Sequence, residues 1–106
     1  MLSPIVQTKI ESQIGSNKIM LYIKGTAQQP QCGFSAAVVQ VFNAIGQPYE
    51  TENILEDGDL RQGLKEFSSW PTFPQIYVGG EFVGGCDIVM ELNSRGELAQ
   101  IVQDAI

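Results

Sequence analysis

Cys32 is the residue whose type and position most clearly allow chemistry. The segment Gln31-Cys32-Gly33-Phe34-Ser35 follows a continuous apolar run, Ile19 to Ile23, and precedes apolar residues at helical spacing that end at Gly46. These patterns predict a buried strand followed by an amphipathic helix. Cys32 is therefore expected at a helix N-terminus, where free backbone N–H groups and the helix dipole favour a thiolate. Lys24, close by in such an arrangement, would lower the pKa of the thiol further.

Ser35 determines which sulfur chemistry Cys32 can perform. A two-cysteine redox site would carry its second thiol three residues after the first, and this chain has a hydroxyl there. A mixed disulfide on Cys32 then cannot be resolved by its near neighbour. One interpretation is a degenerate redox site. The other is a lone thiolate with open coordination space, which can ligate soft iron.

The segment Gly84-Gly85-Cys86-Asp87 also has two interpretations. It can be a strand end followed by an N-cap aspartate. Alternatively, two residues without side chains before a helix let backbone N–H groups approach an anion, while Asp87 supplies a negative charge for an amino group. Cys86 either contributes only its backbone or has a thiol that this second helix start makes somewhat reactive.

The hydrophobic pattern predicts the elements that must position these groups, in the order α-β-α-β-α-β-β-α-α. Two parallel-type strand–helix–strand steps precede an antiparallel hairpin with a Gly79-Gly80 turn. This order predicts a thioredoxin-like α/β fold, a four-stranded mixed sheet flanked by helices. The elements are a helix ending at Gly15, strand Ile19–Ile23, helix Gly33–Ile45, strand Tyr49–Ile54, a helix capped by Asp57, strands Gln75–Val78 and Glu81–Val83, and helices Ile88–Asn93 and Glu97–Ala105.

The composition limits the classes of function that remain. The 106 residues fit one domain, and a net charge of −6 argues against binding to nucleic acid or to an anionic membrane surface. Without histidine there is no histidine-based triad, and two cysteines are too few for a four-cysteine metal site. With no membrane-length apolar stretch and no signal-like segment, we expect a cytoplasmic protein, or an organellar one if a transit peptide has been removed.

With these motifs in this order, the chain resembles a single-domain monothiol glutaredoxin of the Cys-Gly-Phe-Ser class over nearly its whole length. The resemblance implies a glutathione-binding protein that holds a 2Fe–2S cluster between two subunits and donates it to apoproteins. A BolA-like partner is a further expectation from the family. One departure is Gln29-Pro30, which follows Ala27-Gln28 where many relatives place a proline directly after the Gly-Thr pair. The other matching motifs are Lys24-Gly25-Thr26, Trp70-Pro71-Thr72-Phe73-Pro74-Gln75 and Gly84-Gly85-Cys86-Asp87.

The resemblance also suggests how glutathione would bind. In the thioredoxin-like fold Pro74 is cis and faces the active cysteine, so Phe73 would offer its backbone to an extended peptide. Asp87 and the backbone around Cys86 suit the γ-glutamyl end, which carries both charges. Lys24 and Arg61 are the candidates for the opposite carboxylate. Two further candidates are weaker: Lys65 one helical turn beyond Arg61, and Trp70, which is expected to pack rather than bind.

Three hypotheses from different classes follow. The first is a cluster carrier with at most weak oxidoreductase activity. An iron–sulfur cluster needs four sulfur ligands from its surroundings, and one chain supplies only one well-placed sulfur. Two chains together with two glutathione thiols would supply all four. The resulting homodimer would be bridged by the cluster. The second is a glutathione-dependent disulfide oxidoreductase with Cys32 as nucleophile and glutathione or Cys86 as resolver. The third is an interaction module with a vestigial cysteine.

Overall fold

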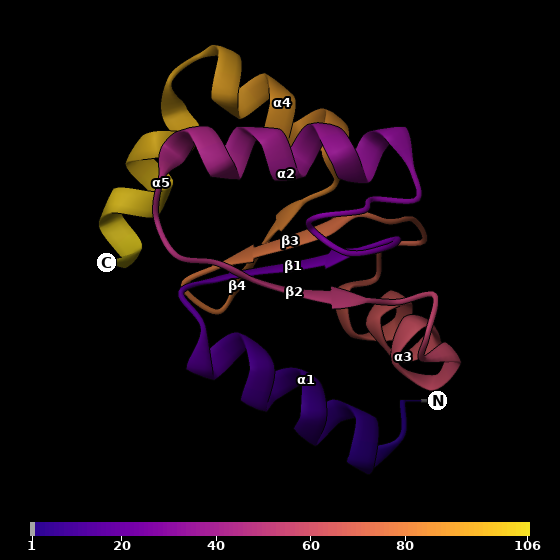
Figure 1. The fold of residues 1–106 in the computed structure, drawn as a ribbon. Helices are drawn as coiled ribbons and strands as arrows, with labels where there is room; N and C mark the ends of the chain where they lie inside the picture. The colour runs from indigo at the N-terminus through magenta and orange to yellow at the C-terminus, as the bar shows by residue number, and fades with distance from the viewer. Residues whose placement is uncertain (1) are drawn as a thin grey trace.

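A strand of five buried residues lies in the middle of the sheet, and the sequence predicts this buried strand. The structure is a computed structural model that describes residues 2–106. Figure 1 shows the fold, and its elements follow the expected order. They are α1 (Pro4–Ser16), β1 (Ile19–Ile23), α2 (Gly33–Ile45), β2 (Glu50–Asn53), α3 (Gly58–Ser68), β3 (Gln75–Val78), β4 (Glu81–Gly84), α4 (Cys86–Ser94) and α5 (Glu97–Ala105).

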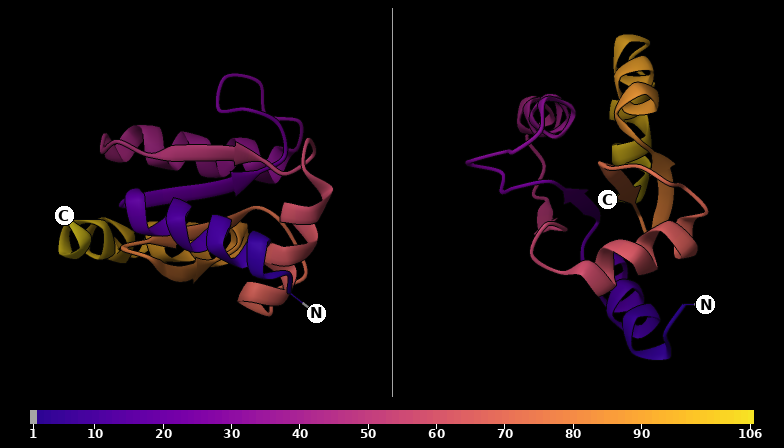
Figure 2. Two further views of the ribbon diagram at one scale, coloured as in Figure 1. Left: turned by 90° about the horizontal axis from the view of Figure 1, so that it is seen from below. Right: turned by 90° about the vertical axis from the view of Figure 1, so that its right-hand side faces the viewer.

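The four strands form one mixed sheet in the order β2-β1-β3-β4. Strand β1 pairs parallel with β2 and antiparallel with β3, and β3 pairs antiparallel with β4. Helices α2, α4 and α5 cover one face of the sheet, and α1 and α3 cover the other (Figures 1 and 2). This arrangement confirms the predicted thioredoxin-like fold with a four-stranded mixed sheet.

The alternation of side chains along β1 divides the core into two clusters. Ile19, Leu21 and Ile23 belong to the cluster under α2, α4 and α5. Met20 and Tyr22 belong to the cluster against α1 and α3. All five side chains are almost completely buried, which explains why β1 is a continuous apolar run.

Glycines end the elements at the positions where the chain must turn back. Gly46 follows α2 with φ 84°, and its N–H donates to the Phe42 carbonyl. Gly79 and Gly80 have φ 62° and 81°, the pair of positive values that a two-residue hairpin turn of this kind requires. These turns return the chain so that the start of α2, the β1–α2 loop and α3 lie at one end of the sheet (Figure 1).

The bounds of β2 and α4 differ most from the sequence prediction, and the ends of α1 and β4 differ by one residue. Strand β2 is limited to Glu50–Asn53, shorter at both ends than expected. Helix α4 begins at Cys86 rather than Ile88, because Gly85 and not Asp87 is its N-cap residue. Asp87 therefore lies in the first turn of α4, where a carboxylate interacts favourably with the helix dipole. The interpretation of Asp87 as an N-cap was wrong.

Candidate functional site

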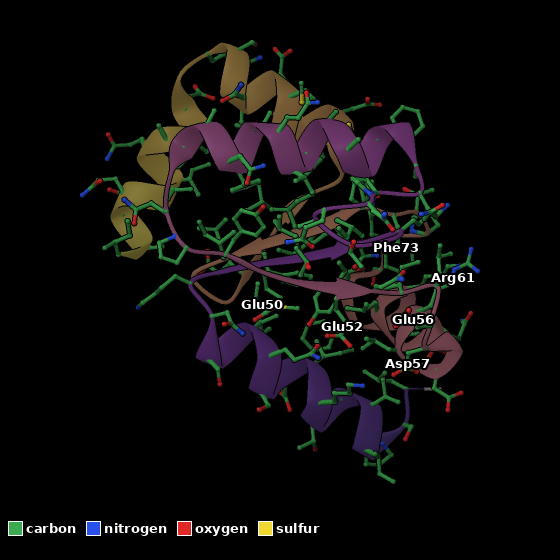
Figure 3. All side chains as sticks on the ribbon, viewed as in Figure 1. Glu50, Glu52, Glu56, Asp57, Arg61 and Phe73 are labelled. Carbon is green, nitrogen blue, oxygen red and sulfur yellow. The ribbon has the colours of Figure 1, made fainter. Side chains whose placement is uncertain are left out.

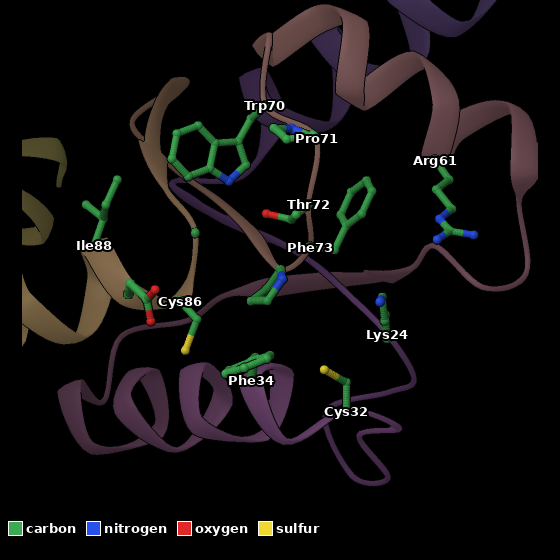
Figure 4. Close-up of a pocket in the computed structure, with 13 residues that line it drawn as sticks. Lys24, Cys32, Phe34, Arg61, Trp70, Pro71, Thr72, Phe73, Cys86 and Ile88 are labelled. Carbon is green, nitrogen blue, oxygen red and sulfur yellow. The ribbon is translucent and has the colours of Figure 1, made fainter.

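A pocket of about 470 Å³ opens at the end of the sheet where α2 begins (Figure 4). Its wall comes from five places in the sequence: the end of β1, the start of α2, the first turn of α3, the connection from α3 to β3, and the start of α4. All the site residues predicted from the sequence line this one pocket: Lys24, Cys32, Arg61, Phe73, Cys86 and Asp87. Lys65 does not line it.

Cys32 is the N-cap residue of α2 and is half-buried at the pocket. Its carbonyl accepts a hydrogen bond from the Ala36 N–H at 2.9 Å, the first of the helix. The pKa of the thiol is lowered chiefly by the backbone N–H of Ser35, against the opposing effect of burial. The backbone N–H of Phe34, the Lys24 charge and the Ser35 hydroxyl lower the pKa further. The helix start thus favours the thiolate, as the sequence indicates.

Ser35 has a structural role that the sequence did not reveal. Its side chain is fully buried, and its hydroxyl oxygen accepts the backbone N–H of Lys24 at 3.1 Å. The bond joins the end of β1 to the first turn of α2. The hydroxyl that replaces a second thiol therefore also holds together the two segments that carry Lys24 and Cys32.

The loop between β1 and α2 folds back on itself beside Cys32. The Gln31 N–H donates to the Lys24 carbonyl at 2.8 Å, and the Gly25 N–H donates to the Asn53 side chain at 2.9 Å. Gly25 has φ 95°, and a Cβ there would lie 2.5 Å from the Gln31 nitrogen. No side chain fits at that position, so Gly25 keeps the loop tight and brings Lys24 near Cys32.

The connection from α3 to β3 forms the opposite wall, and Trp70, Pro71, Thr72, Phe73 and Pro74 all line the pocket. The Phe73–Pro74 peptide bond is cis, as expected for this fold. Within residues 2–106, neither the N–H nor the C=O of Phe73 forms a hydrogen bond. The main chain of Phe73 is thus available to an extended peptide ligand.

Cys86 lies at the pocket as well, but its chemistry differs from that of Cys32. Burial raises the pKa of the Cys86 thiol, and the charges of Asp87 and Cys32 raise it further. The expectation that this second helix start would make Cys86 somewhat reactive was therefore wrong. The neutral thiol is the favoured form, which makes Cys86 the poorer nucleophile and metal ligand of the two cysteines.

Charged groups of opposite sign line the pocket. Lys24 and Arg61 lie on the side of Cys32, and Figure 4 shows both on the opposite side from Cys86. Arg61 comes from α3 and is exposed at the end of the sheet where Phe73 also lies (Figure 3). Asp87 comes from the first turn of α4. A ligand with a carboxylate at one end and an ammonium group at the other suits this separation of charge.

Among the lining residues, Pro71, Thr72 and Ile88 were not predicted as site residues, and Trp70 was expected to pack rather than to bind. Phe34 is 62% exposed where it lines the pocket. The indole Nε1 of Trp70 is buried and has no partner among the described residues. A Cβ at Gly85 would lie 3.1 Å from this nitrogen, so the packing of Trp70 explains why position 85 carries no side chain.

Comparison with known proteins assigns this fold and site to a family. The model of the glutaredoxin family matches residues 19–83, more than half of the chain. The chain belongs to the glutaredoxin family. The match runs from the start of β1 into β4 and includes Cys32, Arg61 and Phe73.

Curated relatives narrow the assignment to the monothiol glutaredoxins. An uncharacterized ycf64-like monothiol glutaredoxin of Synechocystis is 49% identical over 105 residues, which cover 99% of this chain and 98% of the relative. The chloroplastic monothiol glutaredoxin-S14 of Arabidopsis thaliana is 50% identical over 99% of this chain and 61% of its own length. Ser35 agrees with this assignment, since it leaves the segment with a single thiol.

Solved structures share the fold of this glutaredoxin. The solution structure of reduced, apo poplar GrxS14 has a TM-score of 0.87 and 51% identity, covering 97% of this chain and 94% of its own. A crystal structure of a buckwheat glutaredoxin–glutathione complex has a TM-score of 0.85 at 25% identity, covering 95% of this chain and 90% of its own. Among residues 2–106, no helix has both the length and the apolar character to cross a membrane.

Proposed function

We propose that this monothiol glutaredoxin binds glutathione and carries a 2Fe–2S cluster between two chains, donating it to apoproteins. The observation that carries the proposal is the pairing of one activated sulfur, Cys32, with a fully buried hydroxyl at Ser35. The site keeps the features that stabilise a thiolate but has no second thiol at position 35 to resolve a disulfide. Such a site suits a ligand role better than rapid disulfide exchange.

Glutathione fits the groups that line the pocket. Its cysteinyl main chain can pair with the free N–H and C=O of Phe73, as an added strand does. A carboxylate at one end suits Lys24 and Arg61, and the γ-glutamyl end suits Asp87 and the backbone N–H groups at the start of α4. The glutathione complex of the buckwheat glutaredoxin supports this choice of ligand.

The number of available sulfurs supports a cluster shared between two chains. Within residues 2–106, no group of three or more cysteine and carboxylate side chains could hold a metal ion. Cys32 of two chains and two glutathione thiols supply the four sulfurs that a cluster requires. The exposed apolar side chains of Phe34 and Ile88, at the same pocket, would face the second chain, a client apoprotein or a BolA-like partner.

A glutathione-dependent disulfide oxidoreductase is the second candidate, and the position of Cys86 favours it. Both cysteines line one pocket, and the charge of Cys32 contributes to the raised pKa of Cys86. Glutathione would attack the glutathione sulfur of a mixed disulfide at Cys32, releasing the Cys32 thiolate and oxidised glutathione. The Cys86 thiolate would instead attack the Cys32 sulfur, releasing glutathione and leaving a Cys32–Cys86 disulfide. The raised pKa lowers the thiolate fraction of Cys86 and slows the route through Cys86, but not the route through glutathione.

Anaerobic reconstitution with iron, sulfide and glutathione tests the proposed function. We expect Cys32→Ser to lose the cluster, because serine offers no thiolate, and Cys86→Ser to retain it. Bound iron, bound sulfide and visible absorption measured on both variants decide the matter. Equal loss in both variants would make Cys86 a ligand, and a colourless wild type with fast glutathione-dependent disulfide reduction would favour the oxidoreductase.

A further inference from the structure

Gln75 is an unusual residue for the first position of a core strand. Within residues 2–106, only Gln75 and Ser35 are polar residues with fully buried side chains. A buried amide without hydrogen bonds is costly, so its partners indicate why it is there. Gln75 directly follows Pro74, the last of the five consecutive residues that form one wall of the pocket.

The amide of Gln75 is bonded to that wall from inside the protein. Its Nε2 donates to the Trp70 carbonyl at 3.0 Å and, over a longer 3.4 Å, to the Thr72 carbonyl. Both N–H bonds of one amide group are thus directed at the main chain on either side of Pro71. They restrain the segment that ends at Phe73.

Tyr77 orients the Gln75 amide from the same face of β3. Its hydroxyl donates to Gln75 Oε1 at 3.3 Å, as expected for residues two apart on a strand. Burial raises the pKa of Tyr77 to about 12, so the hydroxyl keeps its proton near neutral pH. The Tyr77 ring packs against Tyr22, with centroids 5.6 Å apart, which anchors the network in the core.

We propose that Gln75 is a positioning residue for glutathione, holding residues 70–73 so that the main chain of Phe73 is ready to bind the tripeptide. This inference rests on the proposed function and extends it to a residue that does not touch the ligand. Phe73 forms no hydrogen bond of its own within residues 2–106, so its main-chain geometry depends on its neighbours. Restraint before binding improves affinity because less conformational entropy is lost on association.

Replacing Gln75 by methionine tests the inference, because methionine has a similar shape and no donor. The measurement is the dissociation constant of reduced glutathione, from amide chemical-shift titration of the cluster-free protein under anaerobic conditions. We expect Gln75→Met to weaken binding about tenfold and Tyr77→Phe about threefold, the latter less because the bonds to the two carbonyls remain. In the double variant, Tyr77→Phe should add less than it does alone, since part of its effect passes through Gln75.

Val102→Ala is the matched control, because it also removes buried contacts but lies in α5, outside the pocket. It should lower thermal stability and change glutathione affinity less than about twofold. If Gln75→Met fails to fold, the glutathione affinity of Tyr77→Phe tests the inference in its place. Three results would overturn this inference without touching the proposed function. They are unchanged glutathione affinity in Gln75→Met, an equal loss of glutathione affinity in Val102→Ala, and fully additive losses of affinity in the double variant. A wild type that binds no glutathione would overturn the proposed function and, with it, this inference.

Discussion

At the scale of single residues, Ser35 has two roles: it leaves Cys32 as the single thiol of its segment, and it bonds the end of β1 to the start of α2. The hydroxyl accepts the Lys24 N–H from a fully buried position and contributes to the lowered pKa of Cys32. A thiol at this position would be a weaker acceptor and would bring a second nucleophile within reach of Cys32. Replacing Ser35 by cysteine would therefore change both the sulfur chemistry of the site and the hydrogen bond that joins β1 to α2.

The two cysteines should titrate in opposite directions from the ordinary thiol pKa of 9.0. Because only the thiolate is alkylated, the iodoacetamide rate at Cys32 should rise through a midpoint below 9.0 and that at Cys86 through a midpoint above it. Mass spectrometry of Cys86→Ser and Cys32→Ser across a pH series measures each site alone. In urea, where the fold is lost, the two midpoints should converge. Identical midpoints in the folded variants would refute the assigned electrostatics.

Ser35→Cys should raise glutathione-coupled reduction of a small mixed disulfide and make a bound cluster decay faster in air. The new thiol can attack a mixed disulfide at Cys32 at high effective concentration, and the internal disulfide that forms withdraws the Cys32 ligand. Ser35→Ala is the control, because it also removes the bond to Lys24 but adds no sulfur. If Ser35→Ala turns over as fast as Ser35→Cys, loss of the hydroxyl and not gain of a thiol is the cause.

At the scale of elements, the end of β1, the first turns of α2, α3 and α4, and the α3–β3 connection meet at the pocket. The sequence predicted these elements to different extents. The apolar run of β1 and the glycine turn of the hairpin are local signals, and both elements form as predicted. The start of α4 was misplaced because Asp87 has the residue type of an N-cap, whereas tertiary packing places Gly85 there against Trp70. The Gln75 network joins residues through three-dimensional contacts, and no sequence periodicity indicates it.

Helix α3, which carries Arg61, is tied to α1 through its cap. The Asp57 carboxylate accepts the Leu60 N–H at 3.0 Å and pairs with Lys9 at 2.9 Å. We expect Asp57→Ala to cost about 1–2 kcal/mol, since it removes cap and ion pair together, and Asp57→Asn less than about 0.5 kcal/mol, since asparagine still caps and the pair is exposed. Urea unfolding at neutral pH measures both.

The ion pair also predicts how the effect of Asp57→Asn depends on pH. Lys9 lowers the pKa of Asp57 below its ordinary 3.8, so the contribution to stability is present above 3.8 and lost as the pH falls through the lowered value. The difference between wild type and Asp57→Asn should therefore vanish in acid. A difference that persists below the pKa of the folded carboxyl would show that the pair is not its source.

At the scale of the whole molecule, an acidic protein places two of its six cationic side chains, Lys24 and Arg61, at one pocket. The acidic residues labelled in Figure 3 lie along β2 and the loop that follows it: Glu50, Glu52, Glu56 and Asp57. The resemblance to the monothiol glutaredoxins, together with the local motifs, predicted which residues line the pocket. The hydrogen bond of Ser35 to Lys24 and the bonds of Gln75 to the pocket wall could not be predicted from sequence, because both depend on burial and on distances set by the complete fold.

The central claim is that two chains share one cluster through Cys32 and two glutathione molecules. Native mass spectrometry of the anaerobically reconstituted protein tests this claim most directly, because it weighs chains, cluster and glutathione in one species. The expected species contains two chains, one 2Fe–2S cluster and two glutathione molecules, and it should be absent from Cys32→Ser and reduce to single chains when the cluster is removed. A cluster held by a single chain, or a dimer that retains its cluster without glutathione, would contradict the account.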